Sequence, residues 1–121
     1  MKTVLVVDDS KTEQRLIEAL LQHLGVKVAI ADSGESALSW LENNSIPDLI
    51  VLDIITPGLS GLDLCRQIRA NPELEKIPVV FCSSKDQDFD RFWALRQGGN
   101  AYISKPFAPN DLVATLSKHL N

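Results

Sequence analysis

Cysteine, histidine and long apolar runs are scarce in this sequence of 121 residues, and each shortage excludes a class of protein. The only two cysteines, Cys65 and Cys82, form no CxxC pair, which argues against a disulfide framework and favours a reduced cytoplasmic protein. No apolar stretch approaches the ~20 residues of a membrane-spanning helix, and no secretory leader is evident. The histidines, His23 and His119, fall at the ends of predicted helices, where we expect solvated surface groups.

A block of basic residues is also missing. The sequence has 12 Lys and Arg against 16 Asp and Glu, with a net charge of -4 at pH 7 and a pI near 5.0. Charges spread in this way argue against nucleic acid or an anionic membrane as the direct partner. A chain of this length is one ordinary domain that buries roughly two-thirds of its unfolded surface.

Five short apolar runs alternate with five segments of helical periodicity. The predicted strands cover residues 3–7, 26–31, 49–52, 78–82 and 101–104, and the predicted helices cover 11–24, 34–42, 62–70, 88–97 and 109–120. Such alternation predicts an α/β domain with right-handed crossovers and a parallel sheet. We expect a flavodoxin-like, doubly wound sheet of five strands in the order 2-1-3-4-5, with five helices.

The predicted central strand, residues 49–52, is bracketed by Asp48 and Asp53. Its four consecutive apolar residues indicate a strand covered on both faces. Asp53 then lies at the carboxyl end of the strand, where open parallel sheets bind their ligands. Taken alone, an Asp in this position is as consistent with capping the next turn as with chemistry.

Two more acids, Asp8 and Asp9, end the first predicted strand, which neighbours the strand that ends at Asp53. Three converging carboxylates repel one another unless a cation balances them. No Cys or His is expected nearby, so a hard divalent ion with oxygen ligands suits the position better than zinc does. We expect Mg²⁺ here, with Mn²⁺ as a substitute.

The fourth predicted strand runs into Ser83 and Ser84, and the fifth ends at Lys105. A carboxylate, a hydroxyl donor and a cation together suit a phosphoryl group, because the carboxylate can accept the phosphorus while the others balance and bind its oxygens. A strand-ending Ser usually caps a turn and a lone Lys is usually solvated. Only their conjunction at one edge of the sheet is specific.

The whole sequence resembles the receiver domain of two-component response regulators, the group that includes the chemotaxis regulators. Segments 4–10, 48–53 and 105–107, together with Ser83, carry the resemblance. It implies that Asp53 accepts a phosphoryl group from the phosphohistidine of a sensor histidine kinase or a phosphotransfer domain. It also implies a signalling phosphoacceptor, whose only chemistry is its own phosphorylation and dephosphorylation, rather than an enzyme.

The resemblance implies a ligand set for the metal ion. Asp9, Asp53 and the backbone carbonyl of Ile55 would bind Mg²⁺, and Asp8 would act through water. Two positions depart from the usual pattern: Thr56 stands where most relatives have Met, and Ser84 stands where they have Ala or Gly. Ile55 and Lys85 fall where the family tunes the lifetime of the phosphate.

The resemblance also implies a switch. Lys105 would contact the phosphate and would precede a cis peptide bond to Pro106. Ser83 and Tyr102 match the family's switch pair: Ser83 would move toward the phosphoryl group, and Tyr102 would turn inward. The face made by helix 88–97, strand 101–104 and helix 109–120 would then change and control a downstream protein.

Helix 88–97 carries more aromatic residues than one buried stripe requires. Phe92 and Trp93 could form a docking surface for a partner, or they could pack as ordinary flank residues. Segments 82–85 and 92–103 are similar to regulators of type IV pilus chemotaxis-like systems, notably those of cyanobacterial twitching and phototaxis. Because nothing follows Asn121, we expect a stand-alone receiver, residues 1–121, without an output domain.

Three other interpretations compete with a phosphorylated receiver. A flavodoxin-like cofactor binder needs a Ser, Thr or Gly-rich loop after the first strand, where this chain has Asp8 and Asp9, which repel phosphate. A haloacid dehalogenase-like phosphatase has its second Asp two residues after the first, whereas these two are adjacent. A receiver-shaped interaction module that is never phosphorylated would not need the complete set of acceptor residues.

Overall fold

Five parallel strands form the centre of the structure, a computed structural model that describes residues 1–121. The strands are β1 (Thr3–Val7), β2 (Lys27–Ala31), β3 (Leu49–Leu52), β4 (Val79–Ser83) and β5 (Ala101–Ser104). The helices are α1 (Lys11–Gln22), α2 (Gly34–Asn43), α3 (Gly61–Ala70), α4 (Asp88–Arg96) and α5 (Pro109–Leu120). The strand order is β2-β1-β3-β4-β5, which confirms the predicted topology.

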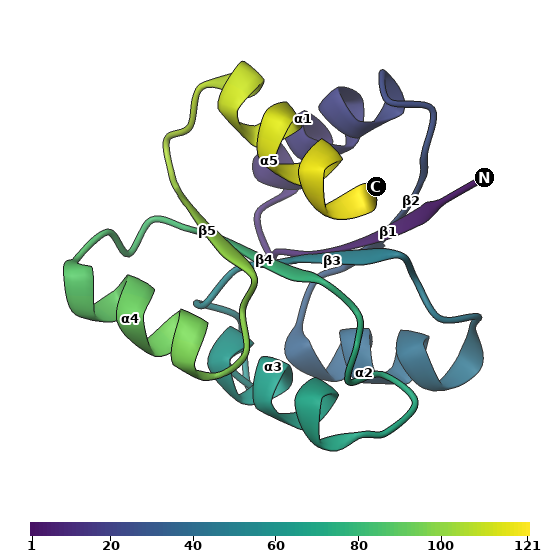
Figure 1. The fold of residues 1–121 in the computed structure, drawn as a ribbon, viewed down its shortest axis with the longest axis vertical. Helices are drawn as coiled ribbons and strands as arrows, with labels where there is room; N and C mark the ends of the chain where they lie inside the picture. The colour runs from purple at the N-terminus through teal and green to yellow at the C-terminus, as the bar shows by residue number, and fades with distance from the viewer.

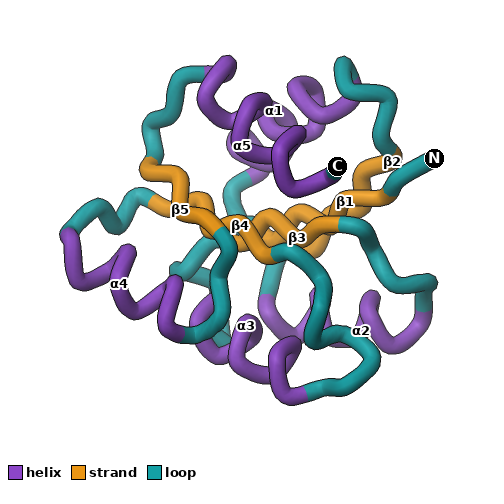
Figure 2. The backbone as a smooth tube through the Cα atoms, viewed as in Figure 1, coloured by secondary structure: helices purple, strands orange, loops and turns teal.

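Helices cover both faces of the sheet (Figure 1). α1 and α5 lie on one face, and α2, α3 and α4 lie on the other, with the strands as a central layer between them (Figure 2). Alternate residues of each strand enter opposite cores: in β1, Val4 and Val6 pack toward α1 and α5, and Leu5 and Val7 pack toward the other helices. Burial on both faces explains the continuous apolar runs in the sequence.

Serine side chains begin three of the helices. The hydroxyls of Ser10, Ser33 and Ser60 accept backbone N–H groups in the first turns of α1, α2 and α3. α1 ends at Gln22, two residues before the predicted end, and Gly25 has a φ of 71° in the turn that follows. A positive φ suits glycine because it has no Cβ.

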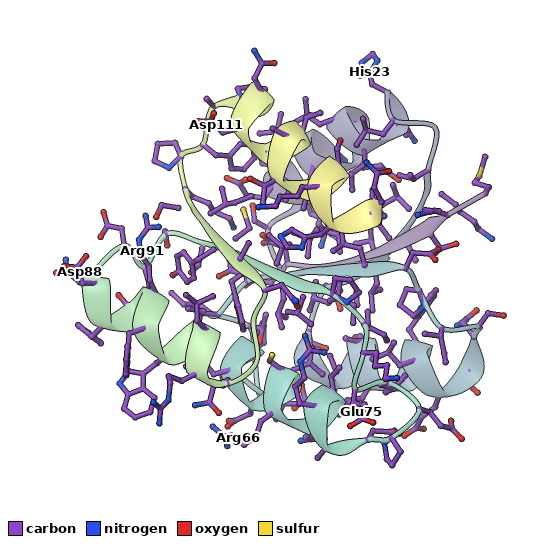
Figure 3. The ribbon with its side chains drawn as sticks, viewed as in Figure 1. His23, Arg66, Glu75, Asp88, Arg91 and Asp111 are labelled. Atoms are coloured by element: carbon purple, nitrogen blue, oxygen red, sulfur yellow. The ribbon has the colours of Figure 1, made fainter.

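The scarce residues differ in their burial. Cys65 and Cys82 are buried and unpaired. His23, which directly follows α1, is exposed (Figure 3). His119 is partly buried in the last turn of α5. No helix combines the length and the apolarity needed to cross a membrane.

Candidate functional site

A lysine joins two buried carboxylates at the carboxyl edge of the sheet. Asp8 follows β1, Asp53 follows β3, and Lys105 follows β5. The Lys105 Nζ atom lies 2.6 Å from Asp8 Oδ2 and 2.9 Å from Asp53 Oδ2. Asp8 is 2% exposed and Asp53 is 7% exposed. Three residues that are far apart in the sequence therefore form one charged cluster, and its two acids outnumber its single base.

Two opposing effects act on the pKa of Lys105. Burial lowers the pKa, but the hydrogen bonds to Asp8 and Asp53 and the negative charges of both carboxylates outweigh burial and raise the pKa above its usual value. Lys105 therefore remains protonated at neutral pH. Its ammonium group is a permanent positive charge beside Asp53.

Hydrogen bonds from the start of α1 orient Asp8. The Ser10 backbone N–H donates to Asp8 Oδ1 at 2.9 Å, and the Gln14 Nε2 atom donates to the Asp8 backbone carbonyl at 2.5 Å. Gln14 is buried although it is polar. These contacts leave Asp8 Oδ2 to face the interior of the cluster, where it binds Lys105.

The loop after β3 orients Asp53. The Ile55 N–H donates to Asp53 Oδ1 at 3.1 Å, and the Gly61 N–H donates to the Ile54 carbonyl at 2.9 Å. A Cβ atom at position 61 would lie 2.0 Å from the Asp53 backbone oxygen, so only glycine allows α3 to begin this close to Asp53.

Side-chain contacts stabilise the rest of that loop. The Thr56 hydroxyl donates to the Leu59 carbonyl at 2.6 Å, and the Leu59 N–H donates to a carboxylate oxygen of Glu35 on α2 at 2.9 Å. Thr56, which departs from the usual Met, thus stabilises the turn through a hydrogen bond. The loop is tied to a neighbouring helix rather than free.

The predicted metal ligands are only partly brought together. Asp8 and Asp53 share the Lys105 ammonium, but Asp9 is exposed, and no group of three His, Cys, Asp or Glu side chains is arranged to hold a metal ion. The Asp9 carboxylate and the Ile55 carbonyl oxygen make no hydrogen bond or ion pair. The available donors are all hard oxygens beside buried negative charge, so the residues fit a hard divalent cation.

Both predicted switch residues, Ser83 and Tyr102, form hydrogen bonds with the backbone of Lys85. Ser83 is fully buried, and its Oγ atom accepts the Lys85 N–H at 3.3 Å. The Tyr102 hydroxyl donates to the Lys85 carbonyl. The Lys105 N–H donates to the Ser83 carbonyl at 2.8 Å, which links this unit to the charged cluster. The backbone of Lys85 therefore connects Ser83 with Tyr102, which lie on different strands.

An arginine covers the Tyr102 ring. The guanidinium carbon of Arg91 lies 5.3 Å from the ring centroid, and Arg91 Nη2 donates to Ser104 Oγ at 2.5 Å. Arg91 extends from the first turns of α4 (Figure 3), and the ring of Phe81 stacks on Tyr102 with centroids 6.3 Å apart. Burial raises the pKa of the Tyr102 phenol, which therefore stays a hydrogen-bond donor at neutral pH. These contacts hold the ring in its present, partly exposed position.

Large apolar side chains are exposed on α4. Phe92 and Trp93 are 53% and 50% exposed, and their rings pack edge to face with centroids 5.7 Å apart. Phe89 and Leu95 are also exposed, and the Arg96 guanidinium lies 5.5 Å from the Phe92 ring centroid. We call Phe89, Phe92, Trp93 and Leu95 the α4 patch. Ordinary flank packing does not account for the exposure of Phe92 and Trp93, because about half of each residue's surface remains in contact with solvent.

Three side chains that organise the site were not predicted from the sequence: Gln14, Glu35 and Arg91. Gln14 had a detectable signal, because it is a polar residue at the helical spacing of the buried Ile17 and Leu21. Glu35 and Arg91 bind residues on other elements of the fold. No local pattern in the sequence identifies such contacts.

The raised pKa values of the two buried thiols give a testable prediction about their reactivity. Burial raises the pKa of the Cys82 thiol from 9.0 to about 12, although the nearby Lys105 charge lowers it. Burial also raises the pKa of Cys65, and Arg69 lowers it. We expect both thiols to resist an aromatic disulfide reagent at pH 8 in the folded protein and to react fully in denaturant. Rapid reaction of the native protein would contradict this expectation.

The raised pKa of Cys82 also makes the free energy of unfolding depend on pH. An unfolded Cys82 thiol releases its proton near 9.0, whereas the folded protein retains it up to about pH 12. The free energy of unfolding that Cys82 contributes is therefore fully present below pH 9.0 and falls as the pH rises from 9.0 to about 12. Denaturant titrations of the wild type and a Cys82→Ala variant across this range would measure the difference.

Comparisons with known proteins agree with this geometry. A family model described as "Response regulator receiver domain" matches residues 4–117. Protein PilH of Pseudomonas aeruginosa is 36% identical over 117 residues, which cover 97% of this chain and 96% of PilH. The crystal structure of the BeF3-activated N-terminal receiver domain of Klebsiella pneumoniae RstA has a TM-score of 0.91 at 32% identity and covers 99% of both chains. The Mn²⁺-bound form of response regulator Rcp1 has a TM-score of 0.84 at 28% identity, covering 98% of this chain and 91% of Rcp1.

Proposed function

Because the chain belongs to the family of response regulator receiver domains, we propose that Asp53 is the phosphoacceptor of a two-component signalling switch. The phosphoryl donor is the phosphohistidine of a histidine kinase or a phosphotransfer domain. One observation carries the proposal: the Asp53 carboxylate is 7% exposed and lies 2.9 Å from a lysine that also binds Asp8. A nucleophilic carboxylate and a fixed positive charge are the groups that phosphoryl transfer to an acid requires.

The transfer is an in-line displacement at phosphorus. An Asp53 oxygen forms the new P–O bond, the P–N bond to the donor histidine breaks, and the departing imidazole takes up a proton from solvent. Lys105 balances the charge of the phosphoryl oxygens. Hydrolysis of the resulting acyl phosphate returns the carboxylate, so the protein carries out its own phosphorylation and dephosphorylation and needs no other catalytic activity.

A divalent cation belongs to this proposal. Asp9, Asp53 and the Ile55 carbonyl would hold Mg²⁺, with Asp8 acting through water, and the ion would neutralise charge on the phosphoryl oxygens. The free oxygens of Asp9 and Ile55 support the assignment. Mn²⁺ has the same preference for oxygen ligands, and the similarity to the Mn²⁺-bound Rcp1 supports it as a substitute.

The contacts of the Lys85 backbone support a path by which phosphorylation of Asp53 changes the position of Tyr102. A phosphoryl group on Asp53 offers Ser83 a charged acceptor, and a move toward it draws Ser83 Oγ away from the Lys85 N–H. The loop then shifts, and with it the Lys85 carbonyl that accepts the Tyr102 hydroxyl. Once released, Tyr102 can turn inward. Driving such a switch from 1:99 to 99:1 requires about 5.5 kcal/mol of differential binding.

The output is a change in the face formed by α4, β5 and α5, which binds a downstream protein. Tyr102 on β5 and Arg91 on α4 are in contact across this face, so a turn of the tyrosine alters both elements. The similarity to PilH supports a role in a motility or taxis system, in the cytoplasm. Neither nucleic acid nor a membrane is proposed as a partner.

Intact mass measurement after incubation with acetyl phosphate and Mg²⁺ tests the proposal. We expect one phosphoryl adduct per chain, which peptide mapping assigns to Asp53, and we expect EDTA to prevent it. A chain that gains no adduct from acetyl phosphate or from a cognate kinase would favour the competing interpretation, an interaction module that is never phosphorylated.

The α4 patch gives a separate prediction about partner binding. Trp93→Ala should weaken binding of the downstream protein at least about tenfold, because exposed aromatic residues dominate interface energies. It should change the free energy of unfolding by less than about 1 kcal/mol, because Trp93 is half exposed. Pull-down assays and thermal melting measure the two effects.

Trp40 provides the matched control. Trp40 is a partly buried residue of α2, and it packs against the hydrophobic core on the face of the sheet that α2 and α3 cover. Trp40→Ala should therefore lower the melting temperature and leave partner binding by the folded protein unchanged. The reverse ranking of the two variants would mean that Trp93 is a packing residue rather than a docking residue.

A further inference from the structure

One buried polar atom has no partner. The Oε2 atom of Glu13, in the first turn of α1, is the only buried side-chain nitrogen or oxygen atom that makes no hydrogen bond. A buried carboxylate oxygen without a donor or a cation is costly, and such atoms in folded proteins usually indicate a missing ligand or a functional role.

Helix capping does not use this carboxylate. Ser10 and Glu13 have the spacing of a capping box, in which the Ser hydroxyl binds the Glu N–H and the Glu carboxylate accepts the Ser N–H. The first bond is present at 3.3 Å. The second is absent, because the Ser10 N–H donates to Asp8 Oδ1 at 2.9 Å instead. Asp8 thus takes the donor that Glu13 would otherwise bind.

Glu13 belongs to the surroundings of the charged cluster. It lies in the helical turn whose other polar residues, Ser10 and Gln14, both bind Asp8. Its negative charge also acts on the Cys82 thiol, together with the charges of Asp8, Asp53 and Lys105. The Glu13 charge is therefore within electrostatic range of the cluster, in which the single Lys105 ammonium contacts only Asp8 and Asp53.

We propose that Glu13 is a further acidic residue of the cation pocket, where its charge strengthens the binding of a divalent cation. The inference rests on the proposed function, because it assumes that the pocket of Asp8, Asp9 and Asp53 binds such an ion. In the metal-free protein the unpaired Glu13 Oε2 atom is a cost, and a cation in the pocket reduces this cost. Glu13 therefore makes the metal-free state less favourable relative to the metal-bound state.

Replacing Glu13 with Gln removes the charge and keeps the shape. We expect Glu13→Gln to weaken Mn²⁺ binding about tenfold, the lower end of the range for residues that support a metal site. Electron paramagnetic resonance of free Mn²⁺ measures this affinity directly, and competition with Mg²⁺ extends it. In EDTA the melting temperature of Glu13→Gln should not fall, because the Oε2 atom makes no hydrogen bond that the replacement would remove.

Glu18→Gln is the matched control, because Glu18 lies on the same helix and its replacement changes the net charge equally. It should bind Mn²⁺ as the wild type does. Equal affinities of Glu13→Gln and Glu18→Gln, with a lower melting temperature for Glu13→Gln in EDTA, would overturn the inference and make Glu13 a helix-stabilising residue. Loss of Mn²⁺ binding in Asp9→Asn would show separately that the pocket exists, whereas a wild-type protein that binds no Mn²⁺ would overturn both the pocket and the role of Glu13.

Discussion

Asp53→Asn is expected to lose the phosphoryl adduct completely. The amide that replaces the carboxylate is a poor nucleophile and cannot form the acyl phosphate. The variant should still fold, because the amide oxygen of an asparagine at this position can keep the hydrogen bond from the Ile55 N–H, and Lys105 keeps its 2.6 Å contact with Asp8. Intact mass measurement with acetyl phosphate and Mg²⁺, with circular dichroism to check the fold, tests the expectation.

Asp32 offers a matched control for this substitution. It directly follows β2 at the same edge of the sheet, but it is exposed, and its Oδ1 atom accepts a hydrogen bond from Ser36 Oγ at 3.1 Å. Asp32→Asn should be labelled as fully as the wild type. If Asp53→Asn retained the adduct, the acceptor assignment would be wrong, and peptide mapping would identify the residue that carries the phosphate.

Lys105→Ala is expected to disable the switch and to make stability depend on a divalent cation. Without the ammonium, the buried carboxylates of Asp8 and Asp53 repel each other, and removing one partner of a buried ion pair typically costs on the order of 3 kcal/mol. Because Mg²⁺ can replace the lost charge, much of this loss should be recovered in its presence. Denaturant titrations in EDTA and in Mg²⁺ measure the difference.

The pKa of Lys105 sets the pH range of this effect. The folded-state pKa is raised, so the stability contributed by the ammonium is fully present below the pKa of a free lysine and is lost only as the pH rises through the higher folded value. The deficit of Lys105→Ala should thus be constant near neutral pH. Lys118→Ala, which removes an exposed charge from α5, is the control and should cost less than about 1 kcal/mol. Equal deficits in EDTA and in Mg²⁺ would mean that no cation replaces the ammonium.

Local patterns in the sequence were sufficient to predict the fold. Four consecutive apolar residues, 49–52, indicated a strand buried on both faces, and the alternation of strands and helices indicated the parallel sheet that the structure contains. The helices predicted from residues 11 and 109 begin at Lys11 and Pro109 in the structure. These patterns are reliable because backbone geometry and burial impose a fixed period on apolar residues.

The same reasoning identified which strand ends carry polar groups but not how those groups pair. Asp8, Asp53 and Lys105 were expected at one edge of the sheet, yet the prediction gave three converging carboxylates, whereas the structure leaves Asp9 exposed and has Lys105 between the other two. The role of the Lys85 backbone, which joins Ser83 to Tyr102, was not predicted. Glu13 has the spacing of a capping residue, and only the bond between Ser10 and Asp8 explains why its carboxylate is left free.

By itself, the sequence determined the order of the elements, the positions of the turns and the residue types delivered to the edge of the sheet, because each depends on neighbours a few positions away. Tertiary packing decided which of those side chains meet. Lys105 reaches Asp53 and Asp8 across separations of 52 and 97 residues. The distances between the acids and their burial decide whether an ammonium or a metal ion lies between them. Packing of the sheet against its helices sets both quantities, and the spacing of apolar residues along the chain does not reveal them.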